Sequence, residues 1–129
     1  MFGKPEILSA AGALSRHASA LQRAVAENVA NADTPGYRAR DVAGFSLDLA
    51  SVPGTMRATR PGHVGASSGP ASDFETVVRK NPETQSINGN GVSIEGEMVR
   101  AVDARRENDV ALAIYRTSLD ILRASLGRR

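Results

Sequence analysis

Residues 27–41 read ENVANADTPGYRARD, and this stretch holds the sharpest change of pattern in the chain. Before it, apolar residues recur every three or four positions, as they do in an amphipathic helix. Within it, Asp33-Thr34 precede Pro35-Gly36. The residue before a proline is pushed out of the α region, and glycine adopts positive φ readily. The stretch therefore predicts that a long helix ends near residue 32 and that the chain then reverses or crosses.

The segment ahead of this turn is predicted to be a helix with a narrow heptad seam. Spacings of four and three residues are typical of a coiled-coil contact. The seam positions are Ile7, Ala11, Leu14, Ala18, Leu21, Val25, Asn28 and Ala32. Leu14, Leu21 and Val25 are expected to carry helix packing. Asn28 is expected to be a buried amide that needs hydrogen-bond partners and fixes the register.

A second helix is predicted from about Ser93 to Leu126, with Gly127 ending it. Ser93 is a suitable N-cap, and Glu95 and Glu97 follow in the first turn, where negative charge complements the helix dipole. A second seam, polar at first and apolar from Leu112 onward, consists of Met98, Ala101, Arg105, Asn108, Leu112, Tyr115, Leu119, Leu122 and Leu126. Arg105 and Asn108 either belong to a polar network between subunits or mark where the seam turns to solvent.

The middle of the chain, residues 43–91, has a different character. VPGT (52–55), RPGHVGASSGP (60–70) and NGNG (88–91) are turn or loop material, while TMRATRPGHVGA (55–66) and FETVVRK (74–80) are compatible with short strands. The chain therefore divides into 1–42, 43–91 and 92–129. The expected fold is mainly α: the two terminal helices form one helical domain, an antiparallel α-hairpin or coiled coil, around a loop-rich middle with at most short β structure.

Composition gives no support for catalysis, metal binding or nucleic-acid binding. The 129 residues include no cysteine, and the two histidines, His17 and His63, lie far apart without clustered carboxylates. His17 is expected to face solvent, and His63 to pack or to stabilise a turn. Glu95 and Glu97 face apart on a helix and form no acid–base pair. With a net charge of +2 and scattered basic residues, no nucleic-acid partner, cofactor, metal or small-molecule substrate is expected.

A two-helix hairpin leaves much apolar surface uncovered. Burying a leucine contributes roughly 1.5–3 kcal/mol, whereas ordering one residue costs roughly 1–2 kcal/mol of backbone entropy. The chain has three phenylalanines, two tyrosines and no tryptophan, so its own core is thin. No apolar run is long enough to span a bilayer, and the first residues lack the apolar core of a cleaved signal peptide. These features favour a subunit that neighbours complete in an assembly.

The stretch NVANADTPGYRARD (28–41) resembles the signature of the bacterial flagellar rod, hook and rod-like axial proteins. In that family an N-terminal helix ends in Asn-x-Ala-Asn-x-x-Thr-Pro-Gly-Tyr. The matching positions are Asn28, Ala30, Asn31, Thr34, Pro35, Gly36 and Tyr37. The version ADTPGYRARD is most similar to that of the proximal rod, as are RPGHVG (60–65), NGNGVSIEGEM (88–98) and the ending 115–126. Val29 departs from the commoner isoleucine.

The resemblance implies a structural, non-enzymatic subunit of the proximal rod of the flagellar basal body, which is required for motility. Family subunits pack their terminal helices into an axial tube that surrounds the export channel and transmits torque. The implied partners are further copies, other rod subunits, the adaptor FliE, the membrane ring and the export gate.

The resemblance also implies a periplasmic location, reached through the flagellar type III apparatus without a cleaved signal peptide. The turn at the subunit interface would consist of Asn28, Asn31, Thr34, Pro35, Gly36 and Tyr37. The alternatives are another flagellar rod protein, or a cytoplasmic coiled-coil regulatory or chaperone-like protein that forms a discrete helical dimer.

Overall fold

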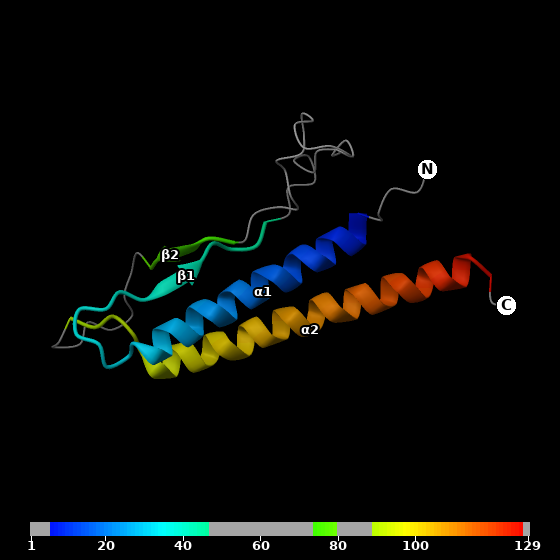
Figure 1. Ribbon diagram of the computed structural model, residues 1–129. Coiled ribbons are helices and arrows are strands. Elements are labelled where there is room, and N and C mark those ends of the chain that lie inside the picture. The colour runs from blue at the N-terminus through cyan, green and yellow to red at the C-terminus, as the bar shows by residue number, and fades with distance from the viewer. Residues whose placement is uncertain (1–5, 47–73, 80–88, 128–129) are drawn as a thin grey trace, which may run out of the picture.

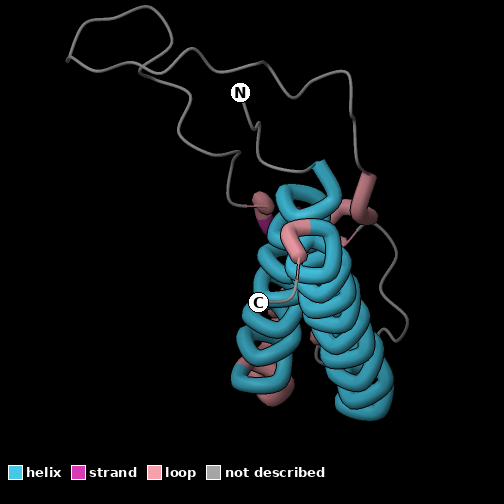
Figure 2. Tube along the Cα trace, turned by 90° about the vertical axis from the view of Figure 1, so that its right-hand side faces the viewer, coloured by secondary structure: helices cyan, strands magenta, loops and turns pink. Residues whose placement is uncertain are grey.

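The computed structural model describes residues 6–46, 74–79 and 89–127. Two long helices dominate it, α1 (Glu6–Ala30) and α2 (Ile94–Ser125). They run antiparallel, so the start of α1 and the end of α2 lie together at the open end of a hairpin (Figure 1). Viewed from that end, the two helices lie side by side (Figure 2). The mainly helical hairpin expected from the sequence is confirmed.

A small ribbon lies against α1. Strands β1 (Arg40–Val42) and β2 (Thr76–Val78) pair antiparallel, with Asp41 opposite Val77. The ribbon contacts α1 through a small core of Ala20, Ala24 and Val42, with Leu21 and Phe74 packed at the edge of this core. β2 falls inside the stretch 74–80 that is compatible with a strand, whereas β1 was not foreseen. The other candidate strand, 55–66, lies outside the described residues.

Both predicted helix boundaries at the closed end are confirmed. α1 ends at Ala30, and the following turn closes at Gly36, which has a φ of +72°. α2 is capped by Ser93, whose hydroxyl accepts a hydrogen bond from the Gly96 amide at 3.3 Å. α2 ends ahead of Gly127, where φ is +78°. Glycine suits both positions because a side chain is strained at positive φ.

The contact surface of α2 differs from the predicted seam by one residue, or about 100° around the helix. The buried residues of α2 are spaced seven apart: Glu97, Ala104, Ala111 and Ser118. Several residues of the predicted seam are instead exposed in the hairpin: Met98, Leu112, Tyr115, Leu122 and Leu126. Alanine and serine let the two backbones approach closely, and this contact, rather than the larger leucines, faces α1.

On α1 the contact follows the predicted spacing more closely. Ala11, Ala18, Val25 and Asn28 are buried. Leu14 and Leu21 are half-buried, and Ile7 at the start of the helix is exposed. The small size of the buried residues again explains why the helices can lie close together without a leucine core.

α2 continues beyond the start of α1. The register is given by hydrogen bonds from Asn28 to Glu97 at 3.0 Å and from Ser15 to Asn108 at 2.9 Å. Continued along both helices, this register places the first turn of α1 beside Ser118. The described residues 120–127 are all exposed, and α2 extends past α1 in Figure 1. Neither described helix combines the length and the apolar character needed to cross a membrane.

Candidate functional site

Asn28 connects α1 to both the turn and β1 at the closed end of the hairpin. Its side chain is fully buried. Its Oδ1 accepts hydrogen bonds from the Arg40 amide at 2.7 Å and from the Tyr37 hydroxyl at 3.3 Å. Its Nδ2 donates to the Arg40 carbonyl at 2.8 Å and to Glu97 Oε2 at 3.0 Å. The expectation of a buried amide with partners is confirmed.

The Asn28 carboxamide forms the hydrogen bonds that a neighbouring strand would form with the outer edge of β1. The Arg79 amide donates to the Ala39 carbonyl at 2.8 Å, so the backbone groups of Arg40, the next residue along, point away from β2. Asn28 pairs with both of these groups, the amide and the carbonyl. The amide of Val42, on the same edge, donates to Asp41 Oδ1 at 2.8 Å. Side chains therefore close the outer edge of a strand only three residues long.

Glu97 is a buried carboxylate with several partners. It has no exposed surface, and besides Asn28 it accepts hydrogen bonds from Arg79 Nη2 at 3.0 Å and Arg100 Nη1 at 3.1 Å. Arg79 also reaches Asp41 at 3.3 Å. Desolvation of a carboxylate is costly unless opposite charges and hydrogen bonds compensate for it. We call Asn28, Asp41, Arg79, Glu97 and Arg100 the closed-end network; it joins α1, the ribbon and α2.

Asn90 holds the turn that follows α1. Its Nδ2 lies within hydrogen-bonding distance of three carbonyl oxygens, those of Asn31 at 3.0 Å, Thr34 at 3.0 Å and Ala32. Its Oδ1 accepts from the Val92 amide at 2.9 Å. One side-chain amide from a segment distant in sequence therefore contacts three carbonyl oxygens of the turn and stabilises it.

His17 is buried, so the expectation that it faces solvent is wrong. Its Nε2 lies 2.8 Å from the Ala43 carbonyl, and its Nδ1 lies 3.1 Å from Glu107 Oε2. Its ring packs against Phe45 and Phe74, with centroids 5.5 and 4.9 Å away. A carbonyl can only accept, so Nε2 carries a proton. His17 thus connects α1 and α2 to one end of the ribbon, where β1 ends and β2 begins. Helix periodicity does not reveal this tertiary arrangement.

The remaining predicted positions are distributed as follows. Asn31 donates to the Glu27 carbonyl at 2.8 Å, and Thr34 donates to Asn31 Oδ1 at 3.3 Å. Pro35 and Gly36 are exposed in the turn. Arg105 is exposed, whereas the half-buried Asn108 accepts from Ser15. His63 lies outside the described residues.

Several important residues were not predicted from the sequence: Arg40, Arg79, Asn90 and the network role of Glu97. The only signal for Glu97 was its place in the first turn of α2, which indicated a favourable interaction with the helix dipole. The NGNG sequence indicated a turn but not what Asn90 binds. Both roles depend on partners that are distant in sequence.

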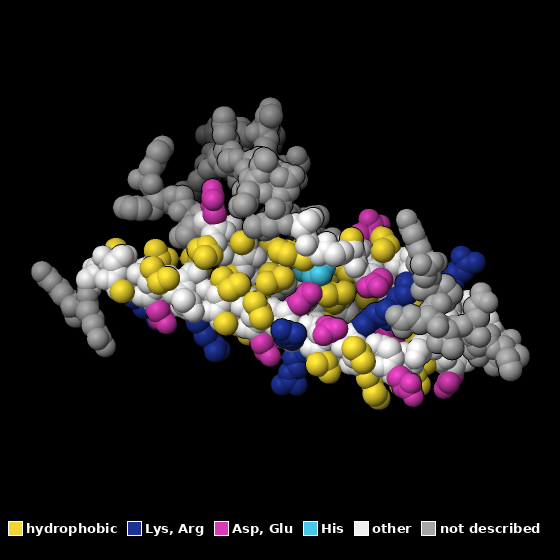
Figure 3. Space-filling model, turned by 180° about the vertical axis from the view of Figure 1, so that it is seen from behind, with side chains coloured by type: hydrophobic (Ala, Val, Ile, Leu, Met, Phe, Trp, Pro, Cys, Tyr) yellow, Lys and Arg dark blue, Asp and Glu magenta, His cyan; other side chains and the backbone are white. Residues whose placement is uncertain are grey.

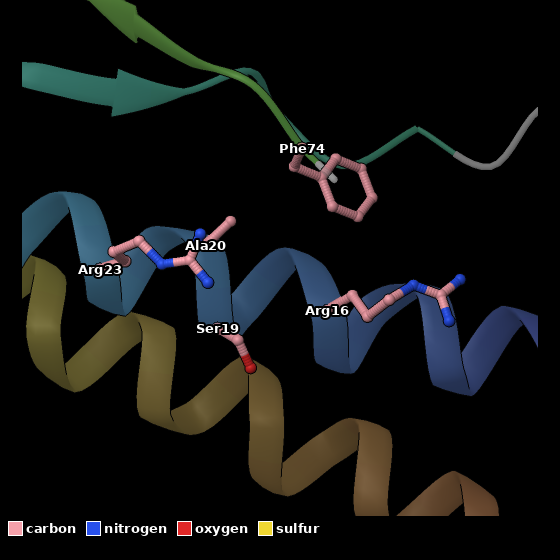
Figure 4. Close-up of a pocket in the computed structure, with 5 residues that line it drawn as sticks. All are labelled: Arg16, Ser19, Ala20, Arg23 and Phe74. Atoms are coloured by element: carbon pink, nitrogen blue, oxygen red, sulfur yellow. The ribbon is translucent and has the colours of Figure 1, made fainter. Parts of the chain in front are cut away.

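One hollow and the metal-ligating side chains of the described residues bear on the question of a binding site. A shallow hollow of about 130 Å³ beneath Phe74 is lined by Arg16, Ser19, Ala20 and Arg23 of α1 (Figure 4). It contains no nucleophile with a base beside it. Among residues 6–46, 74–79 and 89–127, no group of three His, Cys, Asp or Glu side chains is placed to hold a metal ion.

The more extensive feature is an apolar surface along α2. Leu112, Tyr115 and Leu122 are 41%, 44% and 36% exposed, and Leu126 at the helix end is 84% exposed. We call Met98, Leu112, Tyr115, Leu119, Leu122 and Leu126 the exposed stripe; Leu119 alone among them is half-buried. Seen from behind, hydrophobic side chains gather on the half of the hairpin nearer the open end (Figure 3).

The amino-acid sequence of this chain is similar to those of known proteins. Residues 7–38, which cover α1 and the turn, match the family model described as flagella basal body rod protein. The chain is 39% identical to the flagellar basal body rod protein FlgB of Cereibacter sphaeroides over 88 residues, 67% of each chain. It is 31% identical to FlgB of Agrobacterium fabrum over 105 residues, 77% of this chain and 76% of the relative.

The chain belongs to the FlgB family of flagellar basal body rod proteins. FlgB of Salmonella typhimurium is likewise 31% identical over 109 residues, 76% of each chain. The resemblance seen in residues 28–41 is thereby confirmed. These relatives are named as rod proteins, a structural class rather than an enzymatic one, and the chain is a component of the flagellar rod.

In this member of the FlgB family, we predict that Asn28→Ala lowers the free energy of unfolding by about 1–3 kcal/mol, because the backbone groups of Arg40 and the buried carboxylate of Glu97 lose a partner. Asn28→Asp should lower it further, since a second carboxylate would lie beside Glu97. Urea unfolding followed by circular dichroism measures both. Asn31→Ala, at a half-buried position nearby, is the control. Equal effects of Asn28→Ala and Asn31→Ala would contradict this role of Asn28.

For His17→Leu we predict a loss of about 1–3 kcal/mol, because the bonds to Ala43 and Glu107 disappear. The ribbon should loosen while the helices persist, so amide hydrogen exchange should accelerate in β1 and β2 far more than in α1. Arg16→Ala, at the exposed neighbouring position, should leave exchange in the ribbon unchanged. Uniform acceleration across both helices and the ribbon would contradict a local role for His17.

Proposed function

We propose that this chain is a structural subunit of the proximal rod, assembling through its terminal helices into an axial tube that surrounds the export channel and transmits torque. In this role it is required for flagellum-dependent motility. The proposal rests on membership of the FlgB family together with the exposed stripe of α2. A hairpin that leaves such a stripe exposed is suited to burying it against neighbours.

The two ends of the hairpin differ, which supports a head-to-tail, open-ended assembly. α2 extends past α1 with Leu122 and Leu126 exposed at one end, while the turn and the closed-end network lie at the other. A contact between two different surfaces generates a ring or a helical filament rather than a closed dimer. Subunits related by such a contact would form a helical tube, with the exposed stripe in the packing between them.

The motif residues have a defined part in this proposal. Asn28, Asn31, Thr34, Pro35, Gly36 and Tyr37 shape the passage from α1 to the ribbon at the subunit interface. Thr34, Pro35 and Gly36 are exposed in the hairpin and therefore accessible to neighbours. The large apolar residues of the exposed stripe, with Leu14, Leu21 and Val25 on α1, would provide helix packing.

The proposed partners are further copies, other rod subunits, the adaptor FliE, the membrane ring and the export gate. The chain would reach the periplasmic rod through the flagellar type III apparatus, without a cleaved signal peptide. The thin core supports this route, because the apolar part of the helix contact is mostly alanine, which buries little area per residue. No cofactor, nucleic acid or small-molecule substrate has a part in the proposal.

Deleting the gene in the bacterium that encodes this chain tests the proposal. We expect the deletion strain to lose swimming and to yield basal bodies without a rod, and the wild-type gene to restore both. The chain should copurify with basal bodies and retain its original N-terminus, as mass spectrometry would show. A deletion strain that swims, with the chain as a discrete cytoplasmic dimer, would overturn the proposal and favour a coiled-coil regulator.

A further inference from the structure

Asn90 and Gly91, ahead of α2, form a chemically reactive pair that has no part in the proposed rod assembly. Asn90 is followed by Gly91, a pair in which the side-chain carboxamide of asparagine can react with the next backbone nitrogen. Glycine favours this reaction because it has no side chain to hinder the approach and its backbone is flexible. We propose that Asn90-Gly91 is a deamidation site that the fold protects, so that only chains that remain unfolded are modified there.

In the folded chain, both reacting groups are engaged. Asn90 is 5% exposed, its Nδ2 faces the carbonyls of Asn31, Ala32 and Thr34, and its Oδ1 accepts from Val92. The nucleophile, the Gly91 nitrogen, is also held, because its N–H donates to the Tyr37 carbonyl at 3.2 Å. Reaction requires the carboxamide carbon to rotate onto that nitrogen, which would break these bonds together. Unfolding removes all of them.

The reaction is balanced with water as the only co-reactant. The Gly91 nitrogen, losing its proton, attacks the Asn90 side-chain carbonyl carbon. A new C–N bond forms, the bond to the side-chain nitrogen breaks, and ammonia leaves a cyclic imide. Water then opens the ring at either carbonyl. One opening gives aspartate, and the other gives isoaspartate, in which the backbone runs through the former side chain. No oxidant or reductant is needed.

Either product is incompatible with the turn. A carboxylate has no N–H to donate, so a negative charge would face the carbonyl oxygens that Nδ2 now binds. Isoaspartate would also lengthen the backbone between the turn and α2. The modification therefore removes the contact that holds residues 31–34, and it does so irreversibly. The longer the molecules remain unfolded, the smaller the fraction of them that can still form this turn.

Peptide mapping by mass spectrometry tests the protection directly. The purified chain is incubated at neutral pH, folded in buffer or unfolded in guanidinium, and tandem spectra assign the modified residue. We expect Asn90 to convert at least about tenfold faster in guanidinium, the factor that each ~1.4 kcal/mol of protection gives. Asn108, followed by Asp109, is an internal reference that should react slowly in both. Gly91→Ala should slow the reaction in guanidinium.

The consequence is tested separately with Asn90→Asp and Asn90→Ser. We expect Asn90→Asp to accelerate hydrogen exchange in residues 31–37 and to weaken the hairpin, with Asn90→Ser, which retains a neutral donor, less affected. Equal deamidation rates in buffer and guanidinium would overturn the protection. An Asn90→Asp chain with wild-type exchange and unfolding would overturn the consequence. Neither outcome depends on rod assembly, so the proposed function is tested independently.

Discussion

Replacing Glu97 with alanine should lower the free energy of unfolding by about 3–5 kcal/mol, which is the effect of removing one partner from a buried ion pair. Glu97 has no exposed surface and accepts hydrogen bonds from Asn28, Arg79 and Arg100. Without it, the Arg79 guanidinium, whose side chain is only 9% exposed, loses its buried partner and, among the described residues, keeps Asp41. Because a small domain has a net stability of only about 5–15 kcal/mol, this loss would remove a large share of the stability of the hairpin.

Helicity by circular dichroism in a urea series measures the effect of Glu97→Ala. Glu97→Gln keeps the size and one oxygen and should fall between the alanine variant and wild type. Glu95→Ala, in the same helical turn but exposed, is the matched control and should change stability little. If Glu97→Ala and Glu95→Ala unfold at the same urea concentration, the closed-end network does not stabilise the hairpin.

Leu112→Asp should abolish rod assembly while leaving the isolated hairpin folded. Leu112 is 41% exposed in the hairpin and belongs to the exposed stripe. If a neighbouring subunit covers Leu112, removing this side chain weakens the free energy of each subunit contact by about 1.5–3 kcal/mol. This loss raises the protein concentration needed for assembly roughly tenfold to a hundredfold. Burying the new carboxylate adds to that cost. The same loss recurs at every subunit, so we expect a non-swimming strain.

Swimming assays and electron microscopy of basal bodies measure the effect of Leu112→Asp, while circular dichroism verifies the fold. Val110→Asp is the matched control, because Val110 is 46% exposed but lies on another face of α2. Rods that form normally with Leu112→Asp would remove the exposed stripe from the subunit contact and leave the family assignment intact. Loss of assembly in both variants would mean that the contact is broader than the stripe.

Local chemistry made much of the fold predictable. The end of α1 follows from proline and glycine at positions 35 and 36, and the start of α2 follows from the hydroxyl of Ser93. These signals involve residues a few positions apart, so the sequence alone contains both partners. The burial of Asn28 was also predictable, because the heptad spacing places it among buried residues of α1.

The seam of α2 was not predictable in the same way. A hydrophobic ranking selects Leu112, Leu119 and Leu122, but the hairpin buries Ala104 and Ala111 instead. α2 has two competing apolar surfaces, one that packs against α1 and one, the exposed stripe, that we propose packs against other subunits. Periodicity identifies the more hydrophobic of the two surfaces, and in this hairpin the more hydrophobic surface is the exposed one.

The order of the residues alone was enough to infer the two helices, their ends, the turn motif and, through that motif, the flagellar family. The closed hairpin was needed to establish which face of α2 meets α1, what surrounds Glu97, where His17 lies and which carbonyls Asn90 binds. The two groups of features differ in how far apart in sequence the interacting residues are. Caps and turns act within one or two helical turns, whereas a buried charge or amide is stabilised by groups that only the closed hairpin brings together.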